Sequence, residues 1–252
     1  MSTIWQKGHL NVNDHTAFPV EFLQPCANAE YACTQVMLNP HHPDTSLSQV
    51  PIDYIRKIRG AGMKAFGFVW ADSFSSPEDL YRFVIGWRRQ SLDNGCAITG
   101  FVINAEDGWE YKDQTTGGDW SRRFLNYFRS DPATAKLSLA INTYNGCGGI
   151  ALAKWQAAGA RLYYQTFHEG VTHEWPIDGG VTWAKYYGFT KKALVKPNWG
   201  TYQPYPNRTE QIRAAQWART LGFSAWYAEG AGDPASLLLP LLREARAAGV
   251  CC

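Results

Sequence analysis

The sequence predicts an α/β fold, a single TIM-type (β/α)8 barrel domain that spans residues 1–252 and has an irregular first β/α unit. Three observations lead to this prediction. The chain has 252 residues, which is near the usual length of one complete barrel. Short runs rich in β-branched and aromatic residues alternate with amphipathic segments, as expected for parallel strands joined by crossover helices. Neither an internal repeat nor a linker-like segment divides the sequence, which favours one domain.

Eight runs have the composition of strands, and the first of them is weak. The expected strands are 7–12, 33–38, 64–70, 98–104, 136–142, 161–165, 193–196 and 223–227. Amphipathic helices are expected at 51–62, after the third strand, and at 120–128, 150–159, 209–222 and 234–249. Residues 13–31 have no clean amphipathic pattern, which is why the first β/α unit is expected to be irregular.

The helix after the third strand has the clearest signals. Ser76 is a suitable N-cap, and Pro77 suits the first turn. One helical face then carries large apolar side chains, so this face is expected to be buried. Its residues are Leu80, Phe83, Val84 and Trp87.

Charge and composition exclude several classes of function. The net charge is +2 and the sequence has no basic run, so nucleic acid is not an expected partner. No stretch approaches the ~20 apolar residues of a membrane span, and residues 1–10 do not resemble a secretory signal. We therefore expect a chain that is made in the cytoplasm and has no membrane partner.

No motif predicts a metal or a cofactor. His41-His42 and the pair His168 and His173 lack the spacing and the carboxylate context of a zinc site. Residues 146–149, Gly-Cys-Gly-Gly, are not followed by a lysine, and we interpret them as a βα turn rather than a phosphate-binding loop. The expected cofactors and metal ligands are therefore none.

Polar residues at the C-terminal ends of the strands are the candidates for function, because the βα loops of a barrel meet there. On the fourth strand an apolar set, expected to face the helices, alternates with a set that faces the barrel interior. The two sets are Phe101, Ile103 and Ala105, and Val102, Asn104 and Glu106. A partly desolvated carboxylic acid beside aromatic side chains suits a general acid, so Glu106 is the leading catalytic candidate. The alternative is that Glu106 caps a loop or pairs with Lys196.

The fourth and sixth strands carry a resemblance to a known family. The run Gly-Phe-Val-Ile-Asn-Ala-Glu at 100–106, with Tyr-Tyr-Gln at 163–165, resembles the glycoside hydrolase family 25-like barrels. These include lysozyme-like muramidases, endolysins and barrel domains of bacteriophage minor tail proteins. In the muramidases the fourth strand carries an Asp-x-Glu motif whose glutamate is the general acid. The resemblance implies this role for Glu106, with Asn104 at the aspartate position, and only Asp14 is available for the aspartate that muramidases present from the first strand.

The second carboxyl group that most glycosidases use has several candidates. Asp72 and Glu229 follow the third and eighth expected strands and are ranked equally as catalytic residues, and Glu169 is a further candidate. A substrate-assisted route for an N-acetylated sugar would require less of a second carboxylate.

The expected substrate-binding residues are polar and aromatic side chains near the strand ends. Eleven Trp and thirteen Tyr make the chain rich in aromatic rings, which stack on the apolar faces of sugars. The alternative is that half or more of these rings belong to the core. The expected set is Asn104, Trp70, Trp109, Asn142, Tyr144, Gln165, Lys196, Asn198 and Trp199.

Residues and resemblance together predict a glycoside-hydrolase-like barrel that acts on bacterial cell-wall or surface glycan and is associated with a bacteriophage. The expected partners are a bacterial polysaccharide or peptidoglycan and other phage tail proteins, at the virion or the bacterial cell surface. The alternative is a non-catalytic carbohydrate-binding or structural tail protein, which Asn104 and the missing first-strand aspartate favour. A third interpretation is a barrel enzyme for a small molecule, because fold alone does not determine function.

Overall fold

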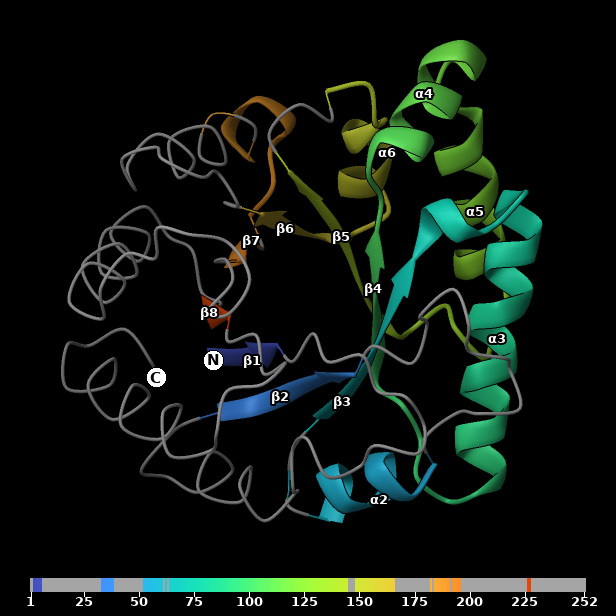
Figure 1. The fold of residues 1–252 in the computed structure, drawn as a ribbon, viewed down its shortest axis with the longest axis vertical. Helices are drawn as coiled ribbons and strands as arrows, with labels where there is room; N and C mark the ends of the chain where they lie inside the picture. Colours follow the sequence, from blue (N-terminus) through green and yellow to red (C-terminus); the bar gives the residue numbers. More distant parts are fainter. Residues whose placement is uncertain are drawn as a thin grey trace, which may run out of the picture.

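The computed structural model describes residues 2–5, 33–38, 52–60, 62, 64–144, 148–165, 182, 184–190, 192–195 and 226–227. Its strands form one eight-stranded parallel sheet in the order β7-β6-β5-β4-β3-β2-β1-β8. β7 and β8 also lie next to each other, so the sheet closes on itself as the predicted (β/α)8 barrel (Figure 1).

The elements alternate along the chain as the sequence predicts. The strands are β1 (Ser2–Trp5), β2 (Cys33–Leu38), β3 (Lys64–Trp70), β4 (Gly100–Asn104), β5 (Ser138–Tyr144), β6 (Arg161–Gln165), β7 (Lys192–Val195) and β8 (Trp226–Tyr227). The helices are α2 (Ile52–Gly60), the 3-10 turn η2 (Ala71–Ser73), α3 (Pro77–Asp93), α4 (Asp107–Thr116), α5 (Asp119–Ser130) and α6 (Leu152–Ala157).

Strand prediction was accurate except at the start of the chain. β2, β3 and β6 occupy the expected residues, and β4, β5, β7 and β8 differ from expectation only at their ends. The first strand was placed wrongly: it is Ser2–Trp5, whereas the expected segment 7–12 lies outside the described residues. Thr3, Ile4 and Trp5 are β-branched or aromatic, whereas the expected segment contains Gly8 and Asn11, which are depleted in strands. The helices expected at 209–222 and 234–249 also lie outside the described residues.

Helix α4 was not predicted from the sequence. Its buried face carries Trp109 and the polar Asp113, one turn apart, so it lacks the apolar stripe that marks an amphipathic helix. Its N-cap residue, Glu106, makes no side-chain cap hydrogen bond. The local sequence therefore lacks both the apolar pattern and the cap that would mark this helix, and contacts with other parts of the fold must supply what is missing.

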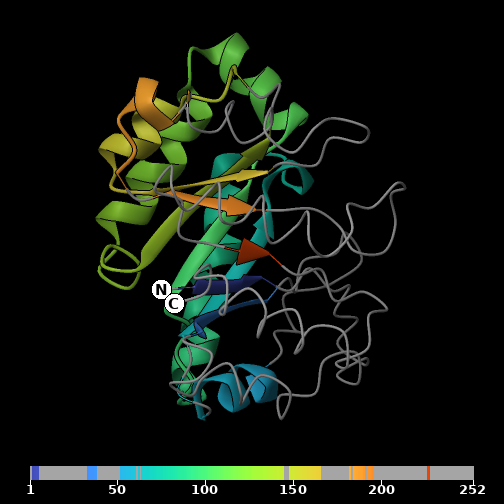
Figure 2. The ribbon, with the colours of Figure 1, turned by 90° about the vertical axis from the view of Figure 1, so that its left-hand side faces the viewer.

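The core lies between the sheet and the helices that cover its outer face. α3 and α5 lie side by side outside β3, β4 and β5, as both views show (Figures 1 and 2). The predicted apolar face of α3 is buried, and Ser76 accepts the expected cap hydrogen bond from the Asp79 N–H at 3.1 Å. On β4 the Phe101 ring packs 5.7 Å from Trp87 and 6.4 Å from Phe128, between centroids. The outward apolar set of this strand therefore faces the helices, as predicted.

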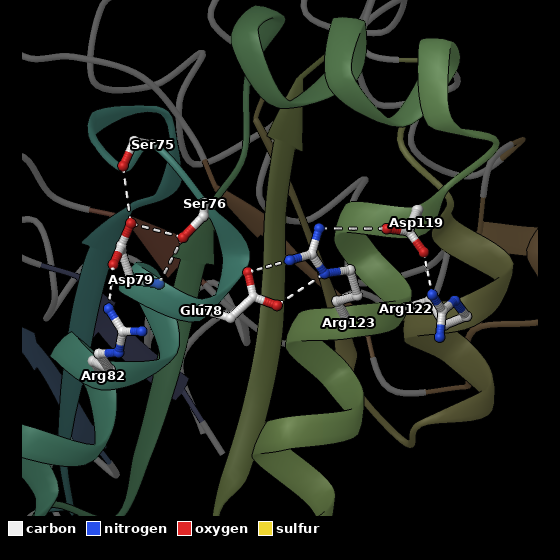
Figure 3. A network of polar contacts seen from close by, with 8 residues as sticks. All are labelled: Ser75, Ser76, Glu78, Asp79, Arg82, Asp119, Arg122 and Arg123. Atoms are coloured by element: carbon white, nitrogen blue, oxygen red, sulfur yellow. Dashed lines mark hydrogen bonds and ion pairs between the residues drawn. The ribbon is translucent and has the colours of Figure 1, made fainter.

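A polar network on the surface ties the starts of α3 and α5 together (Figure 3). Glu78 of α3 and Arg123 of α5 form two short contacts, at 2.8 Å and 2.6 Å. Arg123 also pairs with Asp119 at 3.6 Å. Because Glu78 and Arg123 lie 45 residues apart in the sequence, this bidentate pair fixes one helix against the other.

No helix in the described part of the chain is long and apolar enough to cross a membrane.

Candidate active site

Four neighbouring strands bring one residue each to the same level near their C-terminal ends. The register pairs Trp70 with Asn104, Asn104 with Asn142, and Asn142 with Tyr163. Glu106 follows two residues after Asn104, just beyond the end of β4, where it is partly exposed. The period of two along this strand therefore places Glu106 above the Asn104 level, at the mouth end of the barrel.

A chain of side-chain hydrogen bonds ends on the Glu106 carboxyl. Asn142 Nδ2 donates to Asn104 Oδ1 at 2.5 Å, and Asn104 Nδ2 donates to Glu106 Oε1 at 2.9 Å. Asn142 is fully buried and Asn104 is 2% exposed. Two buried amides thus fix the orientation of one carboxyl oxygen of Glu106. A glutamate that only caps a loop or pairs with Lys196 would not need such support.

Asp72 holds the same residue by its backbone. It lies in η2, directly after β3, and its Oδ2 accepts the Glu106 N–H at 3.1 Å and the Trp70 indole N–H at 3.3 Å. Its Oδ1 is buried and accepts no hydrogen bond in the described part of the chain. The structure therefore brings together two of the three predicted catalytic residues, Glu106 and Asp72, while Glu229 lies outside the described residues.

The Asp72 carboxyl has an unusual electrostatic environment. Burial raises its pKa above the ordinary value of 3.8. The hydrogen bonds from the Trp70 indole and the Glu106 N–H, the nearby Trp109 backbone and the Lys112 charge lower the pKa again but do not offset burial. Asp72 therefore keeps its proton to a higher pH than an exposed aspartate does.

The predicted contact between Trp109 and a sugar is wrong in this structure. Trp109 is fully buried in the core beneath α4 and α5, and its indole N–H bonds to Asp113 Oδ2 at 3.1 Å and to Ser121 Oγ at 3.2 Å. Sequence reasoning placed it in a mouth loop because α4 was not recognised. As the third residue of that helix, its side chain turns inward to the helix layer.

Asn104 and Asn142 also have a role different from the predicted one. Both were expected to touch the substrate, but both are buried, and the amide of Asn104 is engaged at each end within the protein. They lie below Glu106 as supports. Trp70 is partly exposed, so a contact between its ring and a sugar stays a prediction.

The other predicted substrate-binding positions cannot be placed by their side chains. Tyr144 and Gln165 end β5 and β6, next to each other in the register, but their side chains lie outside the described parts of the structure. Lys196, Asn198 and Trp199 lie outside the described residues altogether.

One contributor to the site was missed by sequence reasoning. Gly108 lies in the first turn of α4, and a Cβ at this position would come within 3.0 Å of Asp72 Oδ1. A glycine two residues after the candidate acid was a visible signal, because glycine inside a helix is unfavourable unless a close approach requires it.

Metal ligands were not predicted, and the described residues contain no group of three or more His, Cys, Asp or Glu side chains that could hold a metal ion. The positions 41, 42, 168 and 173, whose histidines were considered, lie outside the described residues. In the 146–149 turn, the Gly149 N–H donates to Glu110 Oε1 at 2.9 Å, so a protein carboxylate takes the place that a phosphate would need.

Comparisons with known proteins identify the fold. No family model matches the sequence, and no curated protein matches it. The chain is similar in structure to the catalytic domain of a family GH18 chitinase from the fern Peteris ryukyuensis, with a TM-score of 0.65, 13% identity, and coverage of 99% of this chain and 100% of that chain. A chitinase from Chromobacterium violaceum gives a TM-score of 0.64 and 12% identity, with coverage of 98% and 99%. The catalytic domain of a β-amylase from Paenibacillus polymyxa gives 0.58 and 8%, with coverage of 99% and 98%. The protein therefore has the (β/α)8 barrel fold that these three enzymes share.

Proposed function

We propose that the chain is a glycoside-hydrolase-like barrel enzyme that cleaves a bacterial cell-wall or surface glycan, with Glu106 as the general acid. The observation that carries this proposal is the chain of buried amides that ends on the Glu106 carboxyl beyond β4. Two of the similar structures are chitinases, which favours an N-acetylated sugar as substrate, because chitin is a polymer of such a sugar. The bacteriophage setting belongs to the same proposal and rests on the family 25-like resemblance of residues 100–106.

The hydrogen bond from Asn104 favours one oxygen of Glu106 as the carrier of the transferable proton. Its Nδ2 donates to Oε1, so a proton on this carboxyl belongs on Oε2. A glycosidic oxygen that approaches Oε2 receives the proton while its bond to the anomeric carbon breaks. The negative charge left on the carboxylate is then stabilised by the same Asn104 amide. Asn142 fixes that amide with its nitrogen toward Glu106.

A substrate-assisted route supplies the second catalytic group. Of the proposed second carboxylates, Asp72 has one oxygen bonded within the protein and the other buried. In a substrate-assisted reaction the acetamido oxygen of the sugar attacks the anomeric carbon, and water then opens the cyclic intermediate. Peptidoglycan, which contains N-acetylated sugars, fits this chemistry.

The test is hydrolysis of purified bacterial cell walls and of chitin oligosaccharides, measured as turbidity loss and reducing-sugar release. Glu106→Gln keeps the shape and the Asn104 contact region but removes the acid, and it should lower kcat by about 10²–10⁴-fold. Glu78→Gln is the matched control, because it makes the same chemical change on the outer surface of α3, and it should keep the activity.

A second function, glycan binding without hydrolysis, is favoured by the asparagine at position 104 and by the engaged carboxyl of Asp72. The same preparations distinguish the two. Cosedimentation with cell walls that is equal for the parent protein and Glu106→Gln, with no release of reducing sugar by either, would replace the enzyme by a binding or structural module of a phage tail.

A further inference from the structure

Both oxygens of the Asp72 carboxyl face other parts of the protein. Oδ2 accepts two hydrogen bonds, from the Glu106 N–H at 3.1 Å and from the Trp70 indole at 3.3 Å. Oδ1 is buried, and within the described residues it accepts none. A nucleophile or a general base must present an oxygen to the sugar or to water, and this arrangement presents neither.

Helix α4 is built to receive this carboxyl at its first turn. Glu106, the N-cap residue, makes no cap hydrogen bond with its own side chain. Gly108 leaves room for Asp72, because a Cβ there would lie 3.0 Å from Oδ1 and 3.3 Å from Cγ. An anionic group at the start of a helix is also favoured by the N–H groups that have no partner within the helix. Asp72 thus supplies from another loop the anchor that Glu106 does not supply itself.

Asp72 and Asn104 hold different parts of Glu106. Its N–H is bound by Asp72, which lies 34 residues earlier in the chain, and its Oε1 is bound by Asn104. The bond from Asp72 fixes the peptide that carries the carboxyl, at the point where β4 has ended and α4 begins.

We propose that Asp72 is a positioning residue for Glu106: it fixes the peptide N–H of the acid and the first turn of α4, and it does not act on the sugar itself. This inference rests on the proposed function for its catalytic consequence. It replaces the expectation that Asp72 is the second catalytic carboxylate.

Two variants of Asp72 separate the two roles. Asp72→Asn keeps an oxygen that can accept both hydrogen bonds and replaces only the oxygen without a partner. It should keep kcat within about threefold of the parent protein, whereas Asp72→Ala removes the acceptor and should lower kcat by about 10–100-fold with little change in KM. Asp93→Asn, an exposed change at the end of α3, is the control for the loss of one charge.

A measurement that does not need activity completes the test. Hydrogen exchange of the Glu106 amide, followed by NMR in the full chain, should be as slow in Asp72→Asn as in the parent protein and at least tenfold faster in Asp72→Ala. Amides elsewhere in α5 should exchange equally in all three proteins, which shows that the alanine variant is folded.

The outcomes are distinct. If Asp72→Asn loses as much activity as Glu106→Gln, Asp72 is a catalytic carboxylate and the positioning role is overturned. Equal exchange of the Glu106 amide in all three proteins overturns it as well. If the parent protein hydrolyses nothing but the exchange rates differ as expected, the proposed function fails while the structural role of Asp72 stands.

Discussion

Asp113 and Asp72 are two carboxylates of the same small region, and their surroundings differ. Asp113 is 1% exposed and accepts hydrogen bonds at both oxygens: from the Ser121 N–H, the Ala151 N–H and the Trp109 indole, each at 3.1 Å, and from the Ser121 hydroxyl. Asp72 has one oxygen bonded twice and one buried oxygen that accepts nothing from the described residues.

The difference in hydrogen bonding suggests that Asp113 serves the stability of the fold and that Asp72 serves the candidate site. A buried carboxylate that is fully hydrogen-bonded joins the elements around it and leaves no acceptor for a ligand. Asp113 does this between α4, α5 and the segment before α6. A carboxylate with an unsatisfied oxygen costs stability, and such a cost is found where a position is kept for another purpose. At Asp72 the bonded oxygen, Oδ2, accepts the Glu106 N–H, and the position of this carboxyl is the one proposed to orient Glu106.

The largest expected effect comes from replacing Asp113, the carboxylate whose two oxygens both accept hydrogen bonds. Asp113→Ala leaves two backbone N–H groups, a hydroxyl and an indole N–H without their acceptor. The free energy of unfolding should fall by about 3 kcal/mol, which corresponds to about 10 °C in Tm. Urea and thermal unfolding measure this loss. A decrease below about 1 kcal/mol would mean that water replaces the carboxylate easily and that the network adds little.

Ser121→Ala should give the next largest effect, because it removes one node of the same network. The Ser121 hydroxyl accepts the Trp155 indole N–H at 2.9 Å and donates to Asp113. Its loss should lower the free energy of unfolding by about 1–2 kcal/mol. In a double-mutant cycle with Asp113→Ala the two losses should not add, since both changes disrupt one network. Simple additivity would argue that the two residues act independently.

Asp72→Asn should change how the stability of the protein depends on pH. Because burial raises the pKa of Asp72 in the folded protein, the folded state binds this proton more tightly than the unfolded state. The contribution of Asp72 to stability is therefore complete below the ordinary aspartate value of 3.8 and is lost as pH rises through the higher pKa of the folded state. The variant should gain stability relative to the parent protein between acidic and neutral pH. Chemical unfolding at several pH values measures this, and a margin that shrinks as pH rises would contradict it.

The smallest effect is expected at Glu78, a half-buried carboxylate in an ion pair at the protein surface. Burial alone would raise the pKa of Glu78, but the hydrogen bond and charge of Arg123 lower it overall, so its contribution is present above the ordinary glutamate range and is lost as pH falls. Glu78→Gln should lower Tm slightly at low salt, and the difference should shrink at ~1 M salt because salt screens ion pairs at the protein surface. A salt-independent loss would show that packing, rather than charge, ties α3 to α5.

The strands and the position of Glu106 were predictable because their signals are local. Alternation along 100–106 assigns one face of β4 to the helices and the other to the interior, and this pattern needs only neighbouring residues. The cap at Ser76 and the buried face of α3 are equally local. Helix α4 was missed because its capping carboxylate comes from Asp72, on a different βα loop.

The roles of Trp109, Asn104 and Asn142 could not be read from residue type. An indole or an amide near a strand end suits a sugar, but whether it meets a sugar or another side chain depends on its neighbours in space. Asn142 and Asn104 lie 38 residues apart, and only the register of β4 and β5 brings their amides together.

A parallel barrel with a glutamate at the mouth end of its fourth strand follows from periodicity and chain direction, which are properties of consecutive residues. The buried groups that hold this glutamate come from different strands and loops, and their hydrogen bonds depend on distances that the closed sheet sets. Asp72, Asn104 and Asn142 became supports of Glu106 for this reason.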